Sequence, residues 1–360
     1  MALTATKIAF YLTLIVFFFG QLLRFQLFSV SFPALDLAIL TLFITNIISL
    51  RTSKNLKIHN KPFLVFLVFT WLTYTTNLIR SNHLSLTSLF YLLRLNLLLS
   101  FFIFPLNKNI FTKKALGFLS LILISSIIFG LLQYFFWPDF TYFDSLQWDP
   151  HLYRLVGTFF DPTFTALIFL IFLIFIFLKK QTITPLVAFS YIGLALTYSR
   201  SSLLAFLLAF TYIALKTKKS RIFIISFIVF LITIFSLPRM PGEGTKLERT
   251  SSIIAKIENY KEAFTLIPKS PVLGIGYNNI SYYRSNTEPN SHSKNAFDSS
   301  LINILVTTGI IGLSLFLLGL YTYFQKTDLT HQTILIALVF HSLFANSLFY
   351  PWCLILLFLI

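Results

Sequence analysis

Apolar runs about as long as a bilayer is thick recur along this 360-residue chain. A helix needs about 20 mostly apolar residues, with a range of about 17–25, to cross the hydrocarbon core. Runs of this kind lie at residues 7–23, 34–50, 62–79, 87–105, 115–136, 162–178, 183–198, 201–215, 222–237 and 300–323. A last block, 332–360, is too long for one ordinary span and short for two. The chain is therefore predicted to be an all-α integral membrane protein, one polytopic domain over residues 1–360 with about 11–12 transmembrane helices.

The composition excludes an ordinary water-soluble protein. Hydrophobic residues make up 56% of the chain and charged residues only 11%, whereas a soluble domain carries about 25% charged residues. The net charge of +16 sits in short clusters between the apolar runs, which is typical of membrane orientation signals rather than of nucleic-acid binding. The single cysteine, Cys353, cannot form a disulfide framework or a Cys/His metal site. We expect no nucleic-acid partner.

The basic residues between the runs predict the orientation of the chain. Lysine-rich clusters follow every second run, and cytoplasmic loops attract lysine and arginine. Both termini are therefore expected in the cytoplasm if there are twelve helices. The first run lacks a convincing signal-peptide cleavage site, so we expect it to be a retained helix. The short outer loops carry single arginines, which grip phosphate better than lysines do.

The large outer loop at residues 238–299 is too long to be a simple connection. Structureless loops beyond about 12–15 residues are uncommon unless they are functional. Apolar residues recur in it at the spacing of one helix face, namely Ile253, Ile257, Tyr260, Phe264 and Ile267. Residues 250–252 offer N-caps, and Pro268 ends the pattern. We predict a short amphipathic helix, which could lie on the membrane surface, act as a lid over a cavity, or do both.

Four segments at the predicted outer face carry the chemically informative residues. They are R-L-V-G-T-F from Arg154, S-R-S from Ser199, P-V-L-G-I-G from Pro271, and D-S from Asp298 followed after nine residues by G-I-I-G from Gly309. Glycine pairs of this kind indicate tight turns with close backbone approach. Each pattern is loose, and the ordered set is more specific.

This ordered set resembles the O-antigen ligase and O-antigen polymerase family of bacterial polytopic membrane glycosyltransferases. The resemblance spans residues 154–312. It implies a metal-independent enzyme without a cofactor, whose donor is a glycan on polyprenyl diphosphate. It also implies a multi-pass protein of the bacterial cytoplasmic (inner) membrane with its active site on the extracytoplasmic face. The residues that support the motifs are Gly157, Ser199, Gly274, Gly276, Gly309 and Gly312.

The resemblance also implies roles for individual residues. The departing diphosphate accumulates negative charge, which arginines can hold with paired N–H donors. Arg154 and Arg200 are the predicted diphosphate ligands, and Arg200 is also predicted to be catalytic. The acceptor hydroxyl needs a proton acceptor, for which Asp298 is the first candidate and His292 the second. The ligases place histidine where this chain has Asp298, so the aspartate favours a polymerase.

Each of these residues also fits a plain structural role. Arg200 could anchor a helix end, and Arg154 could contact lipid headgroups. Asp298 could be the N-cap of the next helix, and Asp161 is expected to cap the run that begins beside it. His292 fits an ordinary loop residue.

Arg94 lies inside the apolar run 87–105, where a charge is costly and usually faces a polar cavity. It could touch the diphosphate, as a third predicted ligand, or pair with an acid such as Asp36. Trp148, in the first large outer loop, is expected in an interfacial aromatic belt, with stacking on sugar rings as the alternative.

We therefore predict a glycosyltransferase that polymerises polyprenyl-diphosphate-linked oligosaccharide repeat units, as in O-antigen or exopolysaccharide synthesis. The close alternative is an O-antigen ligase that transfers the glycan to a lipid or protein. The expected partners are the lipid-linked donor, a glycan, lipid or protein acceptor, and membrane lipids. A rival from another class is a lipid-linked glycan flippase, although the chain lacks the convincing internal repeat of many transporters. A structural membrane subunit without catalysis is the remaining alternative.

Overall fold

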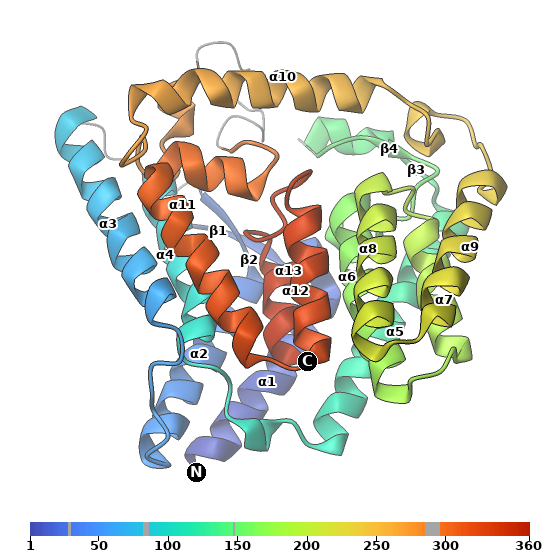
Figure 1. The fold of residues 1–360 in the computed structure, drawn as a ribbon, viewed down its shortest axis with the longest axis horizontal. Helices are drawn as coiled ribbons and strands as arrows, with labels where there is room; N and C mark the ends of the chain where they lie inside the picture. Colours follow the sequence, from blue (N-terminus) through green and yellow to red (C-terminus); the bar gives the residue numbers. More distant parts are fainter. Residues whose placement is uncertain (28–29, 82–85, 147, 285–295) are drawn as a thin grey trace.

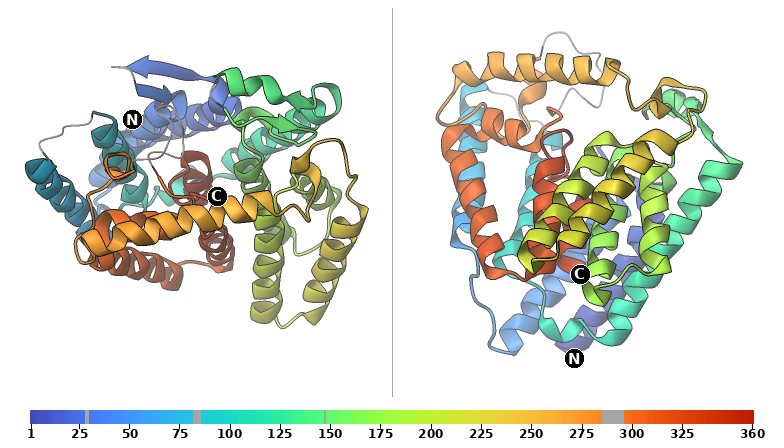
Figure 2. Two further views of the ribbon diagram at one scale, coloured as in Figure 1. Left: turned by 90° about the horizontal axis from the view of Figure 1, so that it is seen from above. Right: turned by 45° about the vertical axis from the view of Figure 1, so that its right-hand side comes forward.

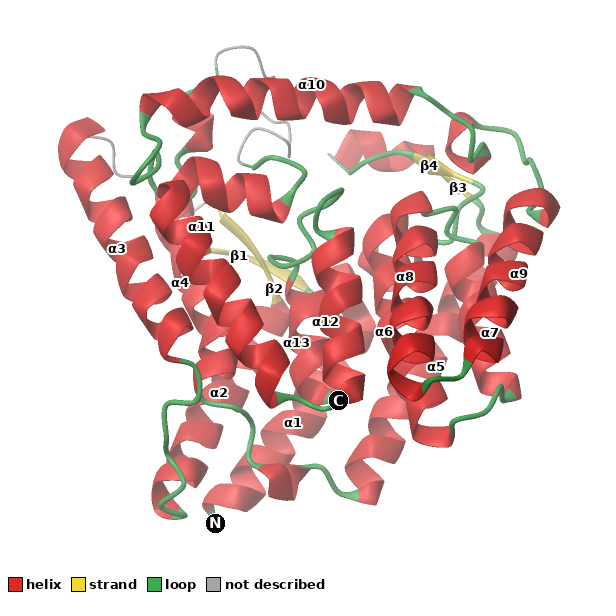
Figure 3. Cartoon of the chain, viewed as in Figure 1, coloured by secondary structure: helices red, strands yellow, loops and turns green. Residues whose placement is uncertain are grey.

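The computed structural model describes residues 1–27, 30–81, 86–146, 148–284 and 296–360. Helices dominate this part of the chain, with two short antiparallel hairpins (Figure 3). Its thirteen α-helices are α1 (Ala2–Phe19), α2 (Ala34–Thr52), α3 (Lys61–Ser81), α4 (Leu86–Ile103), α5 (Lys113–Phe136), α6 (Pro162–Lys180), α7 (Pro185–Ala195), α8 (Arg200–Thr217), α9 (Ser220–Ser236), α10 (Ser251–Leu266), α11 (Ser300–Lys326), α12 (Leu329–His341) and α13 (Pro351–Leu359). The predicted all-α membrane fold is confirmed.

Each predicted apolar run forms a helix, and the last block forms two. Within the described residues, eight helices are long and apolar enough to cross a membrane: α1 to α6, α8 and α11. Helices α7, α9 and α12 are apolar but shorter, and α13 has nine residues. Fewer helices than the predicted number of about 11–12 can therefore span a bilayer by length alone. The shortest, α13, is buried along its whole length, so neighbouring helices cover it instead of lipid.

Helix α6 forms the centre of the bundle. Apart from Thr165, every residue from Phe164 to Leu178 is apolar, and a helix without a polar face is normally buried. Its side chains from Thr165 to Phe177 are buried, and it contacts α5, α7, α8, α12 and α13. The helix begins at Pro162, and the polar residue Asp161 is its N-cap.

The two hairpins are formed by β1 (Arg24–Leu27) with β2 (Val30–Pro33), and by β3 (Asp139–Phe140) with β4 (His151–Leu152). Figure 1 shows β3, β4 and α10 at one end of the bundle and both chain termini toward the other. We call the end of the bundle that carries β3, β4 and α10 the α10 end.

Helix α10 is the amphipathic helix predicted within the long connection. It crosses the end of the bundle (Figures 1 and 2). Lys256 Nζ donates to the carbonyl of Phe344 over 2.6 Å, and the Tyr260 hydroxyl donates to the carbonyl of Leu343. Ile257 and Phe264, from the predicted apolar face, remain exposed. The helix therefore rests on the turn between α12 and α13 through polar contacts and turns apolar side chains outward.

The two glycine motifs pack against each other, backbone to backbone. Gly309 has a φ of 64° and interrupts α11, and Gly274 has a φ of 73°. A Cβ on Gly274 would lie 2.3 Å from the carbonyl carbon of Thr307, and one on Gly309 would lie 2.2 Å from the carbonyl oxygen of Val272. No other residue type tolerates both the left-handed backbone and this contact. The motifs therefore fasten the end of the long outer connection to α11.

Candidate functional site

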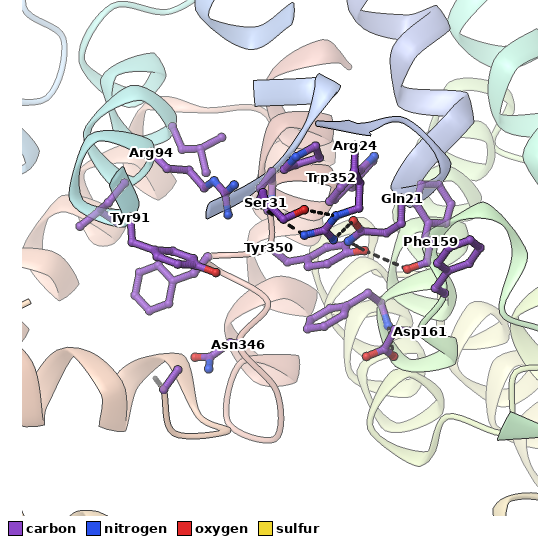
Figure 4. A pocket seen from close by; sticks show the side chains of 18 of the residues that line it. Gln21, Arg24, Ser31, Tyr91, Arg94, Phe159, Asp161, Asn346, Tyr350 and Trp352 are labelled. Carbon is purple, nitrogen blue, oxygen red and sulfur yellow. Dashed lines mark hydrogen bonds between the residues drawn. The ribbon is translucent and has the colours of Figure 1, made fainter. Parts of the chain in front are cut away.

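A cavity of about 450 Å³ lies at the α10 end of the bundle (Figure 4). Arginines, aromatic rings and amides line it together with Asp161: Arg24, Arg94, Tyr91, Trp148, Tyr277, Phe349, Tyr350, Trp352, Gln21, Asn278, Asn303 and Asn346. Aromatic faces with a few placed polar groups are usual in binding sites for small molecules. Rings and amides together suit a ligand with apolar faces and many hydroxyl groups, such as a sugar.

Arg24 is held at the cavity wall by neutral partners. Its Nε donates to Ser31 Oγ over 2.9 Å, and its Nη1 donates to Gln21 Oε1 over 2.7 Å. The guanidinium lies 5.2 Å from the ring centre of Trp148, a cation–π contact. Burial lowers the pKa of Arg24. In the sequence Arg24 is one of several single arginines in the outer loops, and no role was predicted for it.

Arg94 lines the same cavity and pairs with Asp36. Its Nε donates to Asp36 Oδ2 over 2.9 Å, and its Nη2 forms the ion pair with the same oxygen. The pairing of Arg94 with Asp36 is therefore confirmed, whereas its contact with a diphosphate stays a prediction for a side chain that also lines the cavity.

Two buried polar atoms in the cavity wall lack a partner in the described part of the chain. They are the indole Nε1 of Trp352, a donor, and Oδ1 of Asn346, an acceptor. Trp352 is 1% exposed. Buried polar groups are normally paired, so an unpaired donor and an unpaired acceptor on two residues that line the cavity are unusual.

Arg154 is buried beside the cavity rather than in its wall. Its Nε donates to the carbonyl of Thr197 over 2.9 Å. A Cβ on Gly244 would lie 2.9 Å from Arg154 Cδ, so the long connection covers this side chain closely. Burial, then the charges of Arg249 and Arg200, lower the pKa of Arg154 to about 9. An arginine with so low a pKa stands in a strongly positive and poorly hydrated place.

Arg200 is the first residue of α8, behind its N-cap Ser199. Its Nη1 donates to the carbonyls of Arg249, over 2.7 Å, and Leu247, over 3.2 Å. Its Nη2 donates to Ser252 Oγ over 2.5 Å. Arg200 therefore holds the segment that leads into α10.

Arg249 joins Arg154 and Arg200 and was not singled out by sequence analysis. Its Nη1 donates to the carbonyl of Gly244 over 2.7 Å, on the glycine that covers Arg154. Burial and then Arg200 lower the pKa of Arg249. We call Arg154, Arg200 and Arg249 the arginine cluster. Among the described residues, no acid forms an ion pair with any of them, so the cluster is a site of excess positive charge.

Asp161 connects the arginine cluster to the cavity. It lines the cavity, and its charge and that of Arg154 influence each other. Its Oδ1 accepts from the amides of Thr163 over 2.6 Å and Phe164 over 3.3 Å, which confirms the expected cap of α6. Arg154 and Arg200 themselves do not line the cavity.

Asp298 is not the N-cap of α11. That cap is Ser299, whose Oγ accepts from the amide of Ile302. The Asp298 carboxylate instead accepts from Lys256 Nζ over 3.1 Å, and its side chain is 39% exposed. The prediction that Asp298 could cap this helix is therefore wrong. The cap lies one residue later, and the Asp298 carboxylate pairs with Lys256 of α10. His292, the second predicted base, lies outside the described residues.

The remaining motif residues have structural positions. Gly157 begins a short 3₁₀ turn before α6 with a φ of 58°. Gly276 has an amide that donates to the carbonyl of Thr307 over 2.9 Å. Gly312 faces α3, where a Cβ would lie 3.3 Å from Phe69. Together with Ser199, they position the backbone around the site.

Residues 185–317 match the family described as O-Antigen ligase. The chain carries an O-antigen ligase domain. The predicted resemblance to the O-antigen ligase and polymerase family is thereby confirmed, and members of this family are glycosyltransferase-like enzymes. The matched segment runs from α7 into α11 and contains Arg200, Arg249 and Asp298, whereas Arg94, Arg154 and Asp161 precede it. No curated protein matches the chain.

The matched segment and the apolar helices together indicate a multi-pass membrane protein with an O-antigen ligase domain. The arginine cluster could hold an anion, and the cavity could hold sugars. Asp161 stands where the two meet.

Proposed function

We propose that this protein polymerises polyprenyl-diphosphate-linked oligosaccharide repeat units on the outer face of the bacterial cytoplasmic membrane. The single observation that carries the proposal is the arginine cluster without an acidic partner beside the cavity. A diphosphate is the anion that the family's lipid-linked substrates would bring to such a place.

The arginine cluster is suited to hold the diphosphate of the donor. Guanidinium groups bind phosphate oxygens with paired N–H donors. A dry site makes this attraction stronger than it would be in water. As the bond between the anomeric carbon and the diphosphate breaks, the arginines would stabilise the charge of the departing group. This neutralisation by arginine is why we propose transfer without a metal.

The cavity is suited to hold the sugars next to that bond. Trp148, Tyr350 and Trp352 offer ring faces, and Asn346 and Trp352 offer an unpaired acceptor and donor. Asp161 lines this cavity, and its charge and that of Arg154 influence each other, which supports a position of the reacting sugar near the arginine cluster. The α10 end would then face away from the cytoplasm, as the positions of the lysine-rich loops predict.

The ligase remains the second candidate, because the matched family is described by that activity. The polymerase is preferred because Asp298 stands where the ligases are expected to have histidine. The two differ in the acceptor, which is either a second lipid-linked repeat unit or a different lipid or protein.

The purified protein in liposomes with a polyprenyl-diphosphate-linked repeat unit tests this function. We expect glycan chains of several units from the wild type, shorter chains from Arg200→Lys and single units from Arg200→Ala. Arg239→Ala is the matched control, because Arg239 lies in the same connection and forms an exposed ion pair with Glu248. Ser252→Ala removes one hydrogen-bond partner of Arg200 but keeps the charge of Arg200, so this variant should retain activity.

Other products would identify the rival functions. Transfer of one glycan to an added lipid acceptor, without chain growth, would identify a ligase. Movement of the intact donor across the bilayer without any glycosidic bond formed would identify a flippase and end the proposal.

A further inference from the structure

We propose that Asp161, the residue that caps α6, is also the base that accepts the proton of the attacking acceptor hydroxyl. The inference rests on the proposed function and adds a catalytic residue to it. From the sequence, Asp161 was predicted only to cap the helix, and Asp298 or His292 was predicted to be the proton acceptor.

The cap uses one oxygen of Asp161 and leaves the other available. Oδ1 accepts from the backbone amides of Thr163 and Phe164. Oδ2 has no hydrogen-bond partner among the described residues, and the partly exposed side chain lines the cavity (Figure 4). The helix end therefore fixes the carboxylate in place while Oδ2 can receive a proton from a ligand.

The position of Asp161 also suits the reaction. Arg154, whose charge influences Asp161, belongs to the cluster proposed to hold the leaving diphosphate. Tyr350 and Trp352, which line the same cavity as Asp161, belong to the wall proposed to hold sugars. A base must lie within hydrogen-bond reach of the hydroxyl that attacks the anomeric carbon. Asp161 would therefore lie near the junction of diphosphate and sugar, which is the place of the anomeric carbon in the proposed complex.

The surroundings of Asp161 raise the pKa of its carboxyl group, which favours a role as proton acceptor. Its enclosure by the protein raises its pKa, as does the carboxylate of Asp149, whereas Arg154 and the amides of α6 act in the opposite direction. Tyr350 and Cys353 are the other titratable groups that influence it, and both are neutral at pH 7 because burial raises the pKa of Tyr350 and the thiol is not ionised. A base works best when its pKa lies near the working pH.

The other described carboxylates near the site are less suitable. Asp298 is paired with Lys256 and does not line the cavity. Asp36 is paired with Arg94. Asp149 lines the cavity but is exposed to solvent. Asp161 alone among these four combines a fixed position, an unpaired oxygen and a place in the wall.

The proposed step is balanced in atoms and electrons. The acceptor oxygen forms a bond to the anomeric carbon of the donor while the bond from that carbon to the diphosphate oxygen breaks. The diphosphate leaves with the electron pair, still attached to its lipid. The proton of the acceptor hydroxyl moves to Oδ2 of Asp161 and is then released to solvent.

Two substitutions separate the base from the cap. Asparagine and serine cap helices about as well as aspartate does, but neither is a carboxylate base. With a lipid-linked donor and acceptor, Asp161→Asn and Asp161→Ser should lower kcat by about 10²–10⁴-fold. Both should keep the wild-type apparent Tm and affinity for inorganic pyrophosphate. Asp328→Asn is the matched control, because Asp328 caps α12 away from the cavity and should keep full activity.

The pH dependence of kcat/KM distinguishes the base from a positioning residue. Activity of the wild type and of Asp161→Glu should fall at low pH as the carboxylate is protonated, and Asp161→Asn should lose this fall. A near-normal rate for Asp161→Asn and Asp161→Ser would overturn the inference. Loss of activity in Asp298→Asn alone would overturn it in favour of Asp298, with the transferase function intact. Absence of any transfer by the wild type would instead contradict the proposed function.

Discussion

The molecule holds the arginines near its candidate site in two different ways. Arg94, within α4, is neutralised by Asp36. The arginine cluster consists of Arg154 before α6, Arg200 at the start of α8 and Arg249 before α10, and these side chains donate to carbonyl and hydroxyl oxygens. A cation inside a span needs a counterion that is always present. A cluster left without one at the helix ends can accept a counterion from a substrate, and this difference separates a structural charge from a binding charge.

The largest effect on stability is expected when the paired arginine loses its partner. Asp36→Asn leaves Arg94 charged and unpaired, and breaking a buried ion pair in this way costs about 3–5 kcal/mol. The apparent Tm in detergent should fall clearly. The double variant Asp36→Asn/Arg94→Gln, which removes both charges, should recover most of the loss. A single variant as stable as the wild type would break the comparison.

The largest effect on activity is expected at Arg154. Arg154→Gln removes one fixed donor to the departing diphosphate, and such a loss costs about 10²–10³-fold in rate. Initial rates of transfer from a lipid-linked donor measure it. Arg239→Gln, a change of the same kind at an exposed ion pair, should have no effect. If both variants lost activity equally, the positive charge of the whole loop would matter rather than the cluster.

A smaller effect is expected at Arg249. It lies at the edge of the cluster, and its loss should weaken binding of inorganic pyrophosphate by about tenfold, or 1.4 kcal/mol. Titration calorimetry on the purified protein measures this affinity. Arg249→Lys keeps the charge without the paired donors and should give an intermediate value. Unchanged affinity in Arg249→Gln would reduce the cluster to Arg154 and Arg200.

The smallest effect concerns His151, which lies beside the cluster. Burial, then Arg154 and Arg249, lower the pKa of His151 from 6.5 to about 3. Below pH 6.5 His151 is therefore protonated in the unfolded chain but stays neutral in the folded protein. Its contribution thus lowers the free energy of unfolding as the pH falls from 6.5 toward 3. Between pH 7 and pH 5, the apparent Tm of His151→Asn should fall less than that of the wild type. Equal slopes would show that the cluster does not hold this histidine neutral.

The helices were predictable because their signal is local. The length of an apolar run and the residues at its ends do not depend on distant parts of the chain. This holds for α6, with Asp161 as its cap, and for α10, with its spacing of apolar residues. The last apolar block, 332–360, is likewise too long for one ordinary span, and it forms two helices. The cap of α11 was misplaced by one residue because Asp298 and Ser299 are both good caps, and only the contact with Lys256 distinguishes them.

The candidate site was less predictable, since it combines residues that are far apart in the sequence. Arg24 is a single arginine after an apolar run, and nothing nearby indicates that it faces Asp161 across a cavity. Arg249 is one of several basic residues in a long connection, and only its contact with Gly244 brings it to Arg154. The glycine motifs predicted close backbone approach, but not that Gly274 would pack against Thr307 and Gly309 against Val272.

The sequence by itself determined that this protein is a bundle of apolar helices with an O-antigen ligase type of motif order. Those properties follow from hydrophobicity and short-range spacing, which each segment carries alone. Tertiary structure decided which charges are paired, which polar atoms face the cavity, and where Asp161 lies relative to the arginines. Pairing and burial depend on distances between segments, and folding sets those distances only when the helices pack.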